Sequence, residues 1–186
     1  MIGFFDRLRR MAGRSGPGAG RDTGRSGPGA GTDDQRFGTG LWRHNRDRFL
    51  RAVDRYYTTA LALHEARTAG DTTEHDPIDV IIAGTHRLNS LVPIVDDITA
   101  QLHRTQPVTG QIVPGPARQA LGDAPELLTK ASSKVAEAVL AASMARGEAP
   151  AGRSIGSSAR ATERFIADAE ERLERAQQNL ARLEQP

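Results

Sequence analysis

The chain has no cysteine among its 186 residues, which excludes a disulfide scaffold, a zinc site with thiolate ligands and a catalytic thiol. Aromatic residues make up only 4% of it, and lysine occurs only at Lys130 and Lys134. No apolar run approaches the ~18 residues of a membrane-spanning helix, so we expect no segment to cross a bilayer. The length suits one domain of ordinary size with an appendage.

Charge is divided unevenly along the chain. Residues 1–55 contain 12 arginines and 6 acidic residues, whereas residues 56–186 contain 13 basic and 17 acidic residues. A basic front on an acidic body indicates an anionic partner for the front, either a membrane surface or nucleic acid. The alternative is that the arginines only keep a disordered arm in solution.

Residues 1–12 predict a short amphipathic helix. At 100° per residue, its apolar side chains share an arc of about 120° and its arginines occupy the rest. This is typical of a helix lying in a membrane interface, although docking on a protein surface is the alternative. Arginines interrupt the apolar residues, so we do not expect a secretory signal. The predicted membrane-binding residues are Met1, Ile2, Phe4, Phe5, Arg7, Leu8, Arg9, Arg10 and Met11.

Residues 13–40 predict a flexible linker. The octapeptide GRSGPGAG occupies 13–20 and returns unchanged at 24–31. Glycine, proline and serine cannot bury enough apolar surface to offset the entropy of ordering, so the arm should be disordered. No strand precedes the glycines and no Lys-Ser/Thr follows them, so they are not expected to form a phosphate-binding loop.

Residues 41–69 predict the first long helix of the body. Trp42, Phe49, Tyr56 and Leu63 recur every seven residues and are expected in the core. Basic side chains line the opposite face and form a possible contact stripe for an anionic partner. This predicted stripe consists of His44, Arg48, Arg51 and Arg55.

Three more amphipathic helices are expected. One begins after an Asp76 cap with Pro77 in its first turn and runs to about Arg104. Another opens at Asp123 with a capping-box pattern and ends before Gly147. The last carries a heptad seam over 162–183, typical of a bundle or coiled coil and a possible surface for self-association.

These patterns predict an all-α fold, a roughly four-helix antiparallel bundle over residues 41–186 with one long crossover and a disordered N-terminal arm. The crossover contains the uncharged segment 105–117, in which prolines and glycines forbid a continuous helix. Its valines and isoleucine should pack over one end of the bundle.

Motifs for catalysis or metal binding are weak. No histidine follows a glutamate at the Glu-x-x-His spacing of di-iron bundles, and no two lie four apart as in a helical zinc pair. Asp96 and Asp97 resemble part of an aspartate-rich metal motif, but Ala100 stands where a third aspartate would be needed. We therefore expect no metal, no cofactor and no enzymatic activity.

The sequence favours a non-enzymatic helical adaptor or scaffold, tethered to an anionic membrane by residues 1–12. Its expected location is the cytoplasm, at the inner face of the membrane, and its partners are that membrane or another protein. A nucleic-acid or nucleoid-associated protein using residues 1–55 ranks second. A helical-bundle enzyme with a dispersed site ranks third.

Overall fold

The computed structural model describes residues 30–67 and 76–183. The chain divides into two units, Met1–Gly31 and Thr32–Pro186, and the fold below is that of the second. All regular secondary structure in the described residues is helical, and neither range contains a strand. The predicted all-α class is confirmed. The predicted amphipathic helix over 1–12 and most of the predicted linker lie outside the described residues.

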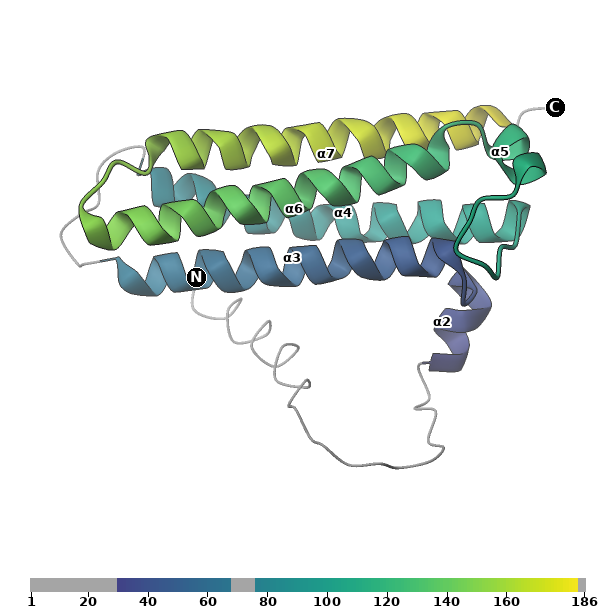
Figure 1. Ribbon diagram of the computed structural model, residues 1–186, viewed down its shortest axis with the longest axis horizontal. Helices are drawn as coiled ribbons and strands as arrows, with labels where there is room; N and C mark the ends of the chain where they lie inside the picture. The colour runs from purple at the N-terminus through teal and green to yellow at the C-terminus, as the bar shows by residue number, and fades with distance from the viewer. Residues whose placement is uncertain (1–29, 68–75, 184–186) are drawn as a thin grey trace, which may run out of the picture. The chain divides into compact units, whose positions relative to one another are not determined.

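Four long helices make up most of the second unit (Figure 1). They are α3 (Leu41–Ala66), α4 (Pro77–Thr105), α6 (Ala124–Glu148) and α7 (Gly156–Leu183). The shorter elements are α2 (Ala30–Phe37), α5 (Gly115–Leu121) and the 3₁₀ turn η1 (Ala149–Ala151).

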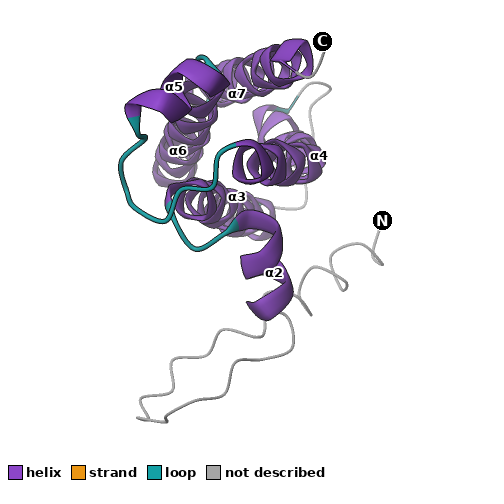
Figure 2. Ribbon diagram, turned by 90° about the vertical axis from the view of Figure 1, so that its right-hand side faces the viewer, coloured by secondary structure: helices purple, strands orange, loops and turns teal. Residues whose placement is uncertain are grey.

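The long helices pack around one core in the order α3, α4, α7, α6, which places α3 diagonal to α7 (Figure 2). Trp42 Nε1 donates to the carbonyl oxygen of Gln106 at 2.9 Å, so α3 begins where α4 ends. Asn45 Nδ2 donates to Thr129 Oγ1 at 3.2 Å, so α3 and α6 begin at the same end and run parallel. The two sequential pairs, α3 with α4 and α6 with α7, run antiparallel. The expectation of antiparallel packing therefore does not hold for α3 and α6.

The predicted heptad positions supply the core. Trp42, Phe49, Tyr56 and Leu63 are all buried. The Tyr56 hydroxyl donates to the Ile81 carbonyl oxygen at 2.8 Å, which ties α3 to α4. The seam of α7 is buried against the other helices of the same chain, except Leu183. These buried seam residues are Thr162, Ile166, Ala169, Leu173, Ala176 and Leu180.

The two predicted caps behave differently. Asp76 has an extended backbone, and its carboxylate accepts a hydrogen bond from the Ile78 amide at 2.8 Å, as expected for an N-cap. Asp123 has φ −91° and ψ 1° and makes no side-chain cap bond. Its carboxylate accepts from Asn179 of α7 instead. The predicted capping box at Asp123 is wrong because the tertiary contact takes its side chain.

The crossover stays at the end of the helices where α3 begins (Figure 1). The sequence did not predict α5, which starts with Pro116 in its first turn, a position that tolerates the missing amide hydrogen. Within the uncharged segment, Val108 is buried as expected. Ile112, however, is 82% exposed, so the expectation that it packs over the core is wrong.

Residues 30–40 are folded, so the predicted linker reaches too far along the chain. Helix α2 ends at Phe37, whose side chain is only 1% exposed. Gly38 adopts φ +69°, a left-handed conformation that favours glycine and ends the helix. The segment around Phe37 contains few apolar residues, so its composition predicted a linker that continues to residue 40. The burial of the Phe37 ring is the apolar contact that orders this segment.

Helix α4 is long and apolar enough to span a membrane by length and composition. Buried core helices share that property. In this fold its residues Ile81, Leu88, Val95 and Leu102 are buried in the core formed with the other long helices.

Candidate anionic-surface interface

The predicted basic stripe forms one exposed face of α3. His44, Arg48, Arg51 and Arg55 are all exposed, on the side of the helix away from the buried rings. Their spacing of three or four residues repeats with the 3.6-residue turn, so the four side chains follow one line along the helix. From Arg48 to Arg55 this line extends about 10 Å at 1.5 Å per residue.

The arginines of the stripe make no ion pair within ranges 30–67 and 76–183. Asp47, beside Arg48 in sequence, is occupied by Arg43 at 3.0 Å and Arg46 at 3.3 Å. Asp54, beside Arg55 and three residues after Arg51, is exposed and forms an ion pair with neither of them. Arg48, Arg51 and Arg55 therefore give this face a net positive charge, which the single carboxylate of Asp54 offsets only in part.

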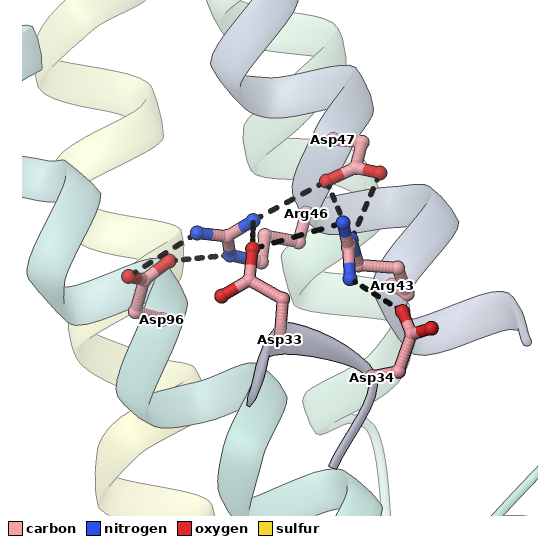
Figure 3. Close-up of polar contacts among 6 residues, drawn as sticks. All are labelled: Asp33, Asp34, Arg43, Arg46, Asp47 and Asp96. Atoms are coloured by element: carbon pink, nitrogen blue, oxygen red, sulfur yellow. Dashed lines mark hydrogen bonds and ion pairs between the residues drawn. The ribbon is translucent and has the colours of Figure 1, made fainter. Parts of the chain in front are cut away.

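Arg43 and Arg46, on the α2 and α4 side of the same helix, are fully engaged (Figure 3). Arg46 binds the Asp96 carboxylate at 2.6 Å, and the two side chains are only 12% and 18% exposed. Arg43 binds Asp34 at 3.2 Å. Burial by itself lowers the pKa of Arg46, but the hydrogen bond to Asp96 and the neighbouring carboxylates raise it above its ordinary value.

Phe37 completes this network. Its ring lies under the guanidinium groups of Arg46, at 4.2 Å from the ring centroid, and Arg36, at 4.9 Å. Arg36 also binds Asp97 at 3.1 Å. The network thus fastens α2 to α3 and α4 through both charge and cation–π contacts. Sequence reasoning missed it, although Phe37 as the only large apolar residue between Ala12 and Leu41 was a signal for it.

Helix α6 contributes exposed apolar side chains on its side that adjoins α3. Leu140 is 64% exposed and Met144 is 55% exposed. Leu140 follows Thr129 by 11 residues, about three turns, so it lies on the side of α6 where Thr129 contacts α3. Met144 lies one turn further along. The face that α3 and α6 share therefore combines three free arginines with two exposed apolar side chains, a pairing the sequence did not reveal.

Three further observations concern the polar groups that could take part in metal binding or catalysis. Among the described residues, no group of three or more histidine and acidic side chains is placed to hold a metal ion. Asp96 and Asp97, the pair resembling a metal motif, are each bound to an arginine. Burial raises the pKa of Tyr56, whose hydroxyl is already bonded to a backbone carbonyl.

Comparison with protein-family models, with curated proteins and with solved structures finds no match to this chain. The function proposed below therefore depends on the residues and the geometry alone.

Proposed function

We propose that this chain is a non-enzymatic peripheral membrane protein, a helical adaptor or scaffold that binds an anionic surface at the cytoplasmic, inner face of a membrane. The observation that carries the proposal is the face shared by α3 and α6. There Arg48, Arg51 and Arg55 of α3 lack ion-pair partners among the described residues, and Leu140 and Met144 are exposed on the adjoining α6. Basic and apolar side chains on one face are what a membrane interface attracts.

The number of free arginines gives an estimate of how strongly the protein should bind an anionic membrane. Each cation near an anionic leaflet contributes about 1 kcal/mol, so three together contribute about 3 kcal/mol, roughly 100-fold in binding. Leu140 and Met144 add an apolar part that salt does not screen. The predicted amphipathic segment 1–12 would supply a second contact of the same chemistry.

The body that carries this face is proposed to be a four-helix bundle built from two antiparallel hairpins, α3–α4 and α6–α7. The buried contacts of each long helix with two neighbours support this architecture. Self-association through 162–183 remains a prediction. Because most of its seam already packs inside the chain, an intermolecular contact would have to use the outer face of α7, including Leu183.

A nucleic-acid-binding protein is the second candidate, because the same free arginines would suit phosphates. Sequence-tolerant binding of single strands also uses exposed aromatic rings for stacking, and the rings of α3 are buried. Exposed Leu140 and Met144 fit an acyl boundary better than a phosphate backbone. A helical enzyme is the third candidate, with the paired states of Asp96 and Asp97 weighing against a metal-dependent site.

Flotation of the full chain with phosphatidylcholine vesicles, with and without phosphatidylglycerol, tests the proposal beside a duplex gel shift. We expect binding to anionic vesicles only. The variant Arg48→Gln/Arg51→Gln/Arg55→Gln should bind them at least tenfold more weakly. A matched variant removes three exposed arginines elsewhere, Arg104, Arg153 and Arg160, which make no ion pair with another described residue, and should lose much less.

Three outcomes contradict the proposal. Equal losses in the two triple variants would mean that only net charge matters. Binding to duplex but not to vesicles would favour the nucleic-acid candidate. Binding to neither vesicles nor duplex would contradict both the membrane proposal and the nucleic-acid candidate.

A further inference from the structure

A cavity of about 610 Å³ lies at the end of the fold where α3 and α6 begin. Its walls come from the first turns of α3 and α6 and from the crossover with α5. Leu41, Val113 and Pro125 supply apolar surface, while Asn45 and Arg118 supply polar groups. This volume falls within the range of small-molecule sites, about 300–1,000 Å³, and apolar walls with a few polar groups are typical of them.

Asn45 is the informative wall residue, because the residue is only 6% exposed and polar groups of buried residues are normally hydrogen-bonded. Its Nδ2 donates to Thr129 Oγ1 at 3.2 Å. Thr129 in turn donates to the Pro125 carbonyl oxygen at 3.0 Å, so its hydrogen is used. The second amide hydrogen and the Oδ1 of Asn45 have no partner among the described residues. One donor and one acceptor thus remain available at the cavity wall.

One charged group near the cavity is available to an anionic ligand. Arg118 is exposed and makes no ion pair in the part of the chain that the structure describes. Of the two acidic wall residues, Glu126 binds Lys130 at 2.7 Å, whereas Asp123 accepts a hydrogen bond from the neutral amide of Asn179 and keeps its charge. The hydrogen bond from Lys130, and to a lesser degree the charge of Arg118, lower the pKa of Glu126. Arg118 is therefore the cation of the wall that is available to pair with a ligand.

We propose that this cavity binds a small amphipathic carboxylate that carries a hydrogen-bond donor close to its acidic group. The carboxylate would pair with Arg118, and the donor and an oxygen of the ligand would satisfy the free groups of Asn45. The apolar body would lie against Leu41, Val113 and Pro125. N-acylated apolar amino acids have this combination of groups. The site is independent of the membrane-facing surface and does not rest on it.

The test uses the full chain and two probes, N-acetylphenylalanine, measured by calorimetry, and the fluorescent sulfonate 8-anilinonaphthalene-1-sulfonate. We expect saturable 1:1 binding of the amino acid and its displacement of the fluorophore. Arg118→Gln should weaken binding at least tenfold. Val113→Trp, which fills the cavity from a partly exposed crossover position, should weaken it at least as much. Arg55→Gln, on the other face, should bind like the wild type.

A melting curve of each variant separates loss of the site from loss of the fold. The proposal is overturned if the wild type shows no saturable binding of the amino acid. It is equally overturned if a folded Arg118→Gln or Val113→Trp retains wild-type affinity. Vesicle flotation of Arg118→Gln and Val113→Trp should be unchanged, so failure of this proposal is distinguishable from failure of the membrane proposal.

Discussion

Helix α3 carries two groups of arginines that differ in what they contact. Arg43 and Arg46 face α2 and α4 and are held by aspartates at 2.6–3.2 Å. Arg48, Arg51 and Arg55 lie within the next three turns and have no such partner among the described residues. The first group stabilises the fold, and the second is available for a partner. Position in three dimensions, and not residue type or sequence distance, separates these roles.

The largest expected effect comes from removing the Phe37 ring, which lies under Arg46 of the paired group. Phe37→Ala should lower the free energy of unfolding by about 3 kcal/mol, because a buried aromatic side chain is lost. At about 2–4 °C per kcal/mol, thermal unfolding followed by circular dichroism should shift by about 6–12 °C. Phe37→Leu, which keeps an apolar side chain there, should cost less than about 1.5 kcal/mol. An unchanged melting temperature for Phe37→Ala would mean that α2 is not part of the cooperative fold.

The next effect compares one arginine from each group. Arg46→Ala should destabilise the protein by about 2–3 kcal/mol, because it leaves the largely buried Asp96 carboxylate unpaired. Arg48→Ala should change stability by no more than about 0.5 kcal/mol. Denaturant unfolding measures both. Adding Asp96→Ala to Arg46→Ala should recover part of the loss, and equal effects of the two single variants would erase the distinction between the groups.

Introducing a carboxylate next to Arg48, one of the unpaired arginines, should change stability less but should clearly weaken membrane binding. His44→Glu places a carboxylate one helical turn before Arg48, worth about 0.3–0.5 kcal/mol to the helix. It should nevertheless weaken flotation with anionic vesicles, because the stripe loses net charge. Gln177→Glu makes the same charge change on α7 and is the control. If both variants bind vesicles equally well, the stripe is not the contact surface.

The smallest effect concerns an exposed pair away from both groups. The hydrogen bond from Lys130 lowers the pKa of Glu126 below its ordinary 4.5. Its stabilisation is therefore present above pH 4.5 and is lost as the pH falls through the lowered value. Urea unfolding of Glu126→Gln should differ slightly from the wild type at pH 7 and not at pH 2. If the difference in unfolding free energy between the variant and the wild type grew as the pH fell, the predicted direction of the pH dependence would be wrong.

Local signals were enough to predict the long helices and their buried faces. Asp76 and Pro77 marked the start of α4, and the seven-residue spacing of Trp42, Phe49 and Tyr56 identified the core side of α3. These features depend on a few neighbouring residues. Helix α2 was missed because its order comes from the burial of Phe37 against other elements, which local composition does not record.

The candidate site could be predicted only in part. The periodic spacing of basic residues predicted the stripe, but the sequence could not show that its arginines form no ion pairs with other described residues. Arg46 finds Asp96 fifty residues away in sequence, whereas Arg48, two positions on, points to a different side of the helix. The exposed Leu140 and Met144 could not be joined to the stripe before the parallel packing of α3 and α6 was known.

The most direct measurement uses the absence of native cysteine. Leu140→Cys and Ala167→Cys would each be labelled with an environment-sensitive nitrobenzoxadiazole dye. Ala167 is exposed on α7, diagonal to α3. On adding phosphatidylglycerol-containing vesicles, the dye at position 140 should shift to the blue and brighten, whereas the dye at position 167 should change little. An unchanged spectrum at position 140 while the protein floats with the vesicles would contradict membrane contact through the α3–α6 face.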